Sequence, residues 1–302
     1  MGRWCGLGGT GSSPGAPGPA FHGTWLAAGS RGRVSVLFRP AGGCDMDVVL
    51  FAALAAVTFA AAALQAATGF GFAILSVPFF LLIMGSLAAI QVTAVTNLAL
   101  SLLLIPKLYR DAPKRLLLLL IAGSSAGFPL GLAAFRHADL ADVKLAVGIV
   151  IVLLALFLAQ REWRSRTGEG AGETSARLDS LPAHPVAEAG VGVISGAMAA
   201  ALAMPGPVVI LYLFALQAGK AVSRAATLTL FGFSYGAVCL IHTLWGGMNW
   251  ETWKLALFLV PFGIAGGIAG HIASGRLSER RFRAVVLAIL IVSGLYAVWS
   301  AL

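Results

Sequence analysis

Two short interruptions of apolar sequence carry the residue types that could bind a ligand. The first spans residues 68–72 and is rich in glycine, and the second spans residues 205–207 and has the sequence Pro-Gly-Pro. Glycine and proline at these places remove helical hydrogen bonds and allow the chain to reverse direction. Helix segments beginning at Gly71 and Pro207 would point their positive N-terminal ends at the interruptions. Backbone N–H groups and helix N-termini together favour the binding of an anion.

Neutral polar side chains surround the two interruptions. Burial of an unpaired amide in hydrocarbon is costly, so Gln65 and Asn97 indicate a binding role. A single threonine is less informative, because its hydroxyl can bond back to its own helix. The candidate substrate-binding residues are Gln65, Thr68, Gly69, Phe70, Gly71, Phe72, Asn97, Pro205, Gly206, Pro207, Tyr212 and Thr227.

Arg224 begins the apolar segment that contains Thr227. A basic residue at the end of an apolar segment commonly anchors membrane topology. The alternative is that Arg224 is a gate or an anion-attracting residue beside the site. The sequence leaves both interpretations open.

Acidic residues are missing from the interiors of the apolar segments, where carboxylates usually mark cation sites and proton relays. This absence argues against a cation pathway. The three cysteines lie far apart, so no metal site is expected. No HExxH, GxSxG or phosphate-binding loop is present, so neither an enzyme nor a cofactor is expected. The acidic residues near the apolar segments all lie at their ends or in loops: Asp47, Asp139, Asp142, Glu188 and Glu251.

The composition is that of a protein embedded in a lipid bilayer. Hydrophobic residues make up 59% of the chain and charged residues 11%, against about 25% charged in soluble domains. The net charge is +9, but the basic residues lie in loops between apolar runs. They form no basic helix or aromatic platform of the kind that binds nucleic acid. We therefore interpret the positive charge as a topology signal.

The basic residues also predict how the two interrupted stretches cross the membrane. If each interrupted stretch is a hairpin that returns to its starting side, fourteen Lys and Arg from residue 46 onward share one side and three lie on the other. If each stretch crosses once, the two sides carry nine and eight. Basic loops favour the cytoplasm, so the hairpin arrangement is predicted. The cytoplasmic loops are then 106–115, 161–187, 219–224 and 274–283.

The two halves of the chain are related by a shift of 134 positions, which places Thr93 on Thr227 and Gly71 on Pro205. The predicted fold is an all-α polytopic membrane protein with about eight hydrophobic spans. It consists of two inverted repeats, each a broken helical hairpin followed by three transmembrane helices, an arrangement common among transporters. The predicted divisions are 1–45, 46–160, 161–186 and 187–302, namely an extension, the first repeat, a cytoplasmic linker and the second repeat. Residues 1–45 are either a mis-assigned gene start or a disordered tail.

Both interruptions resemble motifs of the TauE/SafE sulfite-exporter family. The first motif is Gln-Ala-Ala-Thr-Gly-Phe-Gly-Phe from Gln65, with Pro78 downstream. The second is Met-Pro-Gly-Pro-Val-Val-Ile-Leu-Tyr from Met204, followed by Arg-Ala-Ala-Thr-Leu from Arg224. The first differs from the family's usual triple glycine, because Phe70 and Phe72 flank Gly71. The resemblance implies a multi-pass carrier of the bacterial inner membrane for sulfite, sulfonates or related organic anions.

The sequence therefore predicts a secondary transporter that moves small anions by alternating access, in a lipid bilayer and without nucleic acid. An anion channel of the same fold and a non-transporting membrane scaffold are the alternatives. Whether the chain forms a homo-oligomer is left open. Transport through the predicted site would be lost in Thr68→Val or Gly206→Leu while membrane insertion is kept.

Overall fold

The computed structural model describes residues 48–69, 71–108, 112–166, 184–216, 218–274, 294, 295 and 299. Almost all of these residues lie in helices, and no extended strand occurs among them. The helices are α1 (Val48–Thr68), α2 (Phe72–Met84), α3 (Ala88–Leu108), α4 (Lys114–His137), α5 (Leu140–Arg166), α6 (Pro185–Leu202), α7 (Gly206–Ala215), α8 (Lys220–Leu244) and α9 (Trp250–Ser274).

Six helices of the described part are long and apolar enough to cross a bilayer: α1, α4, α5, α6, α8 and α9. A membrane-spanning helix needs about 20 mostly apolar residues. Helices α2 and α7 are shorter, with 13 and 10 residues. The predicted all-α polytopic class is confirmed. The predicted extension 1–45 and most of the last predicted span, 282–301, lie outside the described residues.

Both predicted interruptions are real helix breaks, and their boundaries repeat at the same spacing. Helices α1 and α6 end at Thr68 and Leu202, which are 134 positions apart, and α2 and α7 begin at Phe72 and Gly206, again 134 apart. The residue after each first helix has a positive φ, 87° at Gly69 and 53° at Ala203. This left-handed conformation terminates a helix.

Each short helix runs back along the helix before it. Phe72 and Leu75 of α2 pack in one cluster with Ala61 and Leu64 of α1. In the second half, Leu213 near the end of α7 shares a cluster with Val191 near the start of α6. The same cluster includes Leu116 and Leu120 near the start of α4 and Ala226 and Leu230 in the first half of α8. Both breaks are therefore reversals, as the hairpin prediction required.

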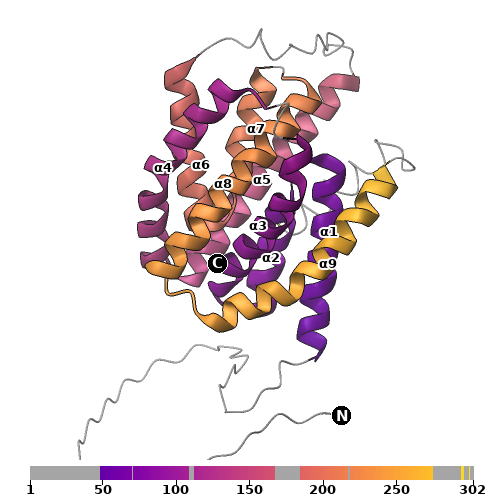
Figure 1. Cartoon of the computed structure of the whole chain (residues 1–302), viewed down its shortest axis with the longest axis vertical. Coiled ribbons are helices and arrows are strands. Elements are labelled where there is room, and N and C mark those ends of the chain that lie inside the picture. Colours follow the sequence, from indigo (N-terminus) through magenta and orange to yellow (C-terminus); the bar gives the residue numbers. More distant parts are fainter. Residues whose placement is uncertain are drawn as a thin grey trace, which may run out of the picture. The chain divides into compact units, whose positions relative to one another are not determined.

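Each helix pair described here joins one helix of the first half to one of the second half. Helix α1 packs along α9, and α6 packs along α4, as Figure 1 also shows, while α3 packs along α8. Gly127 of α4 lies against the backbone of Val193, and Gly266 of α9 lies against the backbone of Phe59. Phe59 and Val193 are again 134 positions apart. The inverted orientation of the halves relative to a membrane stays a prediction.

Candidate functional site

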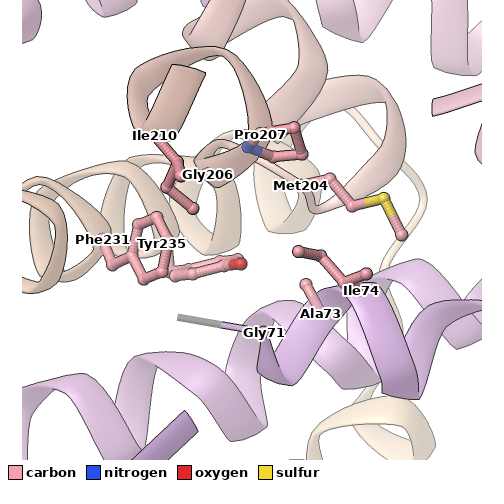
Figure 2. Close-up of a pocket in the computed structure, with 9 residues that line it drawn as sticks. All are labelled: Gly71, Ala73, Ile74, Met204, Gly206, Pro207, Ile210, Phe231 and Tyr235. Atoms are coloured by element: carbon pink, nitrogen blue, oxygen red, sulfur yellow. The ribbon is translucent and has the colours of Figure 1, made fainter. Parts of the chain in front are cut away.

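A small cavity lies between the two helix breaks. On one side it is lined by Gly71 and the first turn of α2, and on the other by Met204 and the start of α7. Figure 2 shows the Tyr235 side chain of α8 extending between these two walls. The cavity has an internal volume of about 10 Å³, which is about the space that one water molecule needs.

The N-termini of α2 and α7 both meet the cavity. Their N-cap residues, Gly71 and Pro205, provide no side-chain hydrogen bond to the first turn. The first intrahelical bond of α2 is the one from the Leu75 N–H to the Gly71 carbonyl, 3.1 Å. The opening N–H groups of a helix have no partner inside the helix, and the helix dipole adds positive potential there. Two such ends at one cavity form a neutral-residue site with positive potential.

Three side chains hydrogen-bond backbone carbonyls at the second break. The Tyr235 hydroxyl donates to the Ala203 carbonyl at 2.9 Å, and the Ser195 hydroxyl donates to the Pro205 carbonyl at 2.8 Å. The His242 Nε2 lies 2.8 Å from the Ala200 carbonyl. Because a carbonyl is only an acceptor, Nε2 must carry the hydrogen. These bonds explain how a helix break is tolerated in the buried interior.

At the first break, Arg224 takes the corresponding role. Its Nη2 donates to the Ala66 carbonyl at 3.3 Å, and its aliphatic stem covers Gly69. A Cβ added at Gly69 would lie 2.8 Å from the Arg224 Cγ. Arg224 is therefore more than an exposed anchor, since it contacts the first break directly.

Several buried polar groups on the helices that form or adjoin the breaks have no hydrogen-bond partner among the described residues. Gln65 and Asn97 are 2% and 0% exposed, and neither side-chain amide forms a hydrogen bond with a described residue. The Tyr235 hydroxyl lies near Asn97, but its bond goes to Ala203. An unpaired buried amide costs about 1–3 kcal/mol. Such groups are typical of a site that pairs them with a ligand. The serine hydroxyls in the same situation are those of Ser76, Ser101 and Ser234.

The predicted residues are placed in three groups. Gly71, Gly206 and Pro207 line the cavity. Gly69 and Pro205 cap the broken helices, and Gln65, Phe72, Asn97 and Thr227 are buried on neighbouring helices.

Tyr212 is placed elsewhere, because it packs with Leu116 and Leu213 away from the cavity lining. Phe70 and the side chain of Thr68 lie outside the described part. Sequence reasoning did not include Ala73, Ile74, Met204, Ile210, Phe231 or Tyr235 in the site. The signal available in the sequence was the spacing of four residues from Thr227 to Phe231 and Tyr235, which places all three on one helix face.

No acidic residue is among the described residues that line this cavity. Glu188 lies in the first turn of α6, at a segment end as the sequence indicated, and is buried, 3% exposed. Its Oε1 accepts a hydrogen bond from the His184 N–H at 3.2 Å. No group of three or more His, Cys, Asp or Glu that could hold a metal occurs among the described residues.

A known family matches most of this chain. The family model described as "Sulfite exporter TauE/SafE" matches residues 54–297. The match covers both breaks, the cavity lining, helices α2 to α9 and α1 from Leu54 onward. No curated protein and no solved structure matches the chain.

Proposed function

We propose that this chain, which belongs to the sulfite exporter TauE/SafE family of membrane transporters, is a secondary carrier of small anions. Sulfite, sulfonates and related organic anions are the proposed substrates, and the bacterial inner membrane is the proposed location. The observation that carries this proposal is the convergence of two helix N-termini on one cavity. Helix N-termini bind anions through free N–H groups and the helix dipole.

The surroundings of the cavity favour a small anion over a cation. Among the described residues that line it there is no carboxylate, and the one polar side chain is that of Tyr235. A dehydrated cation would need oxygen ligands or an acidic partner. An anion can instead replace its water with backbone N–H groups of the helix ends and a nearby amide such as Asn97.

Alternating access is supported by the way the cavity is built. Its two walls come from different halves of the chain, the α1–α2 break and the α6–α7 break. Carriers with repeated halves move one half against the other around a midplane site. We propose that the cavity opens to each side in turn as the two breaks shift relative to each other.

The deciding experiment compares Asn97→Leu with the wild type in proteoliposomes offered sulfite, sulfate, sulfoacetate, taurine and small carboxylates. Leucine is similar in size and has no unpaired polar group, so we expect thermal stability to stay equal or rise by about 1–2 kcal/mol. Uptake should nevertheless fall at least about tenfold, because the ligand loses an amide partner. Saturable uptake in the wild type that persists unchanged in Asn97→Leu would remove Asn97 from the site.

A second variant tests the cavity itself. Gly206→Leu would fill it, because a Cβ at Gly206 already lies 2.8 Å from the Phe231 ring. We expect uptake to be abolished while the protein still inserts. Gly190→Leu is the matched control, since Gly190 is exposed and has nothing within 4 Å. Flux far above carrier turnover would indicate a channel, and no flux from folded protein would favour a scaffold.

A further inference from the structure

We propose that α8 carries a pair of gates, Arg224 at its beginning and His242 at its end, which close the cavity on opposite sides. The inference rests on the proposed carrier function and adds residues that the cavity lining does not include. Both side chains hold a backbone carbonyl of a broken helix. Each gate opens when its side chain releases that carbonyl.

The two carbonyls occupy equivalent positions in the two halves. Arg224 bonds Ala66 in the last turn of α1, and His242 bonds Ala200 in the last turn of α6. Ala66 and Ala200 are 134 positions apart, the same spacing that relates the two breaks. The α6 helix does not use the Ala200 carbonyl, because the Met204 N–H bonds Met198 instead. The two contacts are therefore equivalent, one at the break in each half of the chain.

Both gates lie on the same face of α8. They are 18 residues apart, which is five helical turns and about 27 Å along the axis. Phe231 and Tyr235 lie between them and line the cavity. The Tyr235 hydroxyl also bonds Ala203, so this face of α8 contacts both breaks. Arg224 and His242 thus bracket the cavity from its two ends.

The surroundings of each gate fit a contact that can open. Arg224 is only partly buried, and its Nε has no hydrogen-bond partner among the described residues. His242 is fully buried against Phe135 of α4, with ring centroids 4.5 Å apart, and no described residue hydrogen-bonds its Nδ1. Loss of one of these bonds loosens one broken helix at that carbonyl and leaves the other contact in place. Alternating access requires that one gate can be open while the other stays closed.

The test uses thiol labelling in nanodiscs, where both faces are open to reagent and no substrate is needed. Cys239 lies on α8 between Tyr235 and His242 and is 3% exposed, so it reports on the His242 end. Leu228 is buried between Arg224 and Phe231, so Leu228→Cys reports on the Arg224 end. Each reporter is measured alone, with Cys5 and Cys44 replaced by serine, and with Cys239→Ser added for the second reporter.

His242→Leu should raise the labelling rate of Cys239 at least about threefold and leave Leu228→Cys unchanged. Arg224→Met, which removes the N–H donor and keeps an unbranched stem over Gly69, should do the opposite, raising only the rate at Leu228→Cys. The estimate follows from the loss of one hydrogen bond. His242→Gln, which keeps an N–H donor, should restore the parental rate at Cys239.

Two results would overturn the paired gates. A variant that raises labelling at both reporters would mean general loosening of the fold, and a variant that raises labelling at neither would mean that its contact closes nothing. Because no anion takes part, these results are independent of the uptake experiments. If the labelling results contradict the gates while anion uptake is normal, the gate proposal is rejected and the carrier proposal stands.

Discussion

At the two breaks, equivalent positions carry different residue types but the same backbone conformation. Gly69 and Ala203 both adopt the left-handed conformation that ends a helix, with φ of 87° and 53°. Ala203 is the only residue other than glycine with positive φ among those described. A residue with a Cβ pays about 1–2 kcal/mol for this conformation. The bond from the Tyr235 hydroxyl to the Ala203 carbonyl offsets part of that cost.

We expect Gly69→Ala and Ala203→Gly to change the stability of the protein by unequal amounts. Gly69→Ala should destabilise the protein by about 2 kcal/mol or more, because the new Cβ is strained and also collides with the Arg224 stem. Ala203→Gly should change stability by less than about 1 kcal/mol, since relief of strain offsets the added chain entropy. Thermal unfolding in detergent measures both. Equal losses in the two variants would contradict this account of the breaks.

At the scale of elements, close helix crossings hold the two breaks in place. Gly123, Gly127 and Gly131 of α4 face the α6 backbone, and Gly266 and Gly270 of α9 face the α1 backbone. In a bilayer, small residues allow helices to approach closely and gain packing and dispersion energy. Each broken hairpin is therefore fixed by one long helix from the other half. The sequence spacing of these glycines indicated packing, and the contacts show the partners.

Two neighbouring glycines of α9 provide a matched pair for this packing. Gly266→Ala should lower stability by about 1–3 kcal/mol, because its Cβ would overlap the Phe59 carbonyl oxygen. Gly267→Ala should be neutral or stabilise by up to about 1 kcal/mol, since nothing lies within 4 Å of the new Cβ. Thermal unfolding of the two variants measures both changes in stability. If Gly267→Ala were the more damaging change, the α1–α9 contact would be wrong.

For the whole molecule, the central prediction is that both hairpins return to the side where they start. Fourteen basic residues then share the cytoplasmic face, against three on the other face. The observed reversals at both breaks agree with that path. It makes the first repeat begin outside and the second begin inside.

Sidedness is tested with single cysteines in spheroplasts, using a membrane-impermeant thiol reagent. Asp139→Cys, between α4 and α5, should be labelled from outside, and His184→Cys, before α6, should be labelled only after permeabilisation. Both side chains are exposed, and Cys5, Cys44 and Cys239 would be replaced by serine. Labelling of His184→Cys in intact spheroplasts would reject the predicted topology.

The sequence by itself determined the class of the protein, the position of both breaks and the spacing that relates them. These features are local, because long apolar runs require spanning helices, and glycines or prolines close together, as at residues 69–71 and 205–207, interrupt a helix. The sequence also identified Gly71, Gly206 and Pro207 as candidate site residues, and these three line the cavity.

Only the tertiary structure decided which polar side chains meet the breaks. Tyr235 reaches Ala203, His242 reaches Ala200 and Arg224 reaches Ala66 across 32, 42 and 158 positions of sequence. Tyr212, predicted for the site, instead packs beside Leu213 and Leu116. Helical periodicity tells which residues share a face, but in a chain that is apolar on nearly every face it leaves the neighbour of that face undetermined. Helix packing makes that choice.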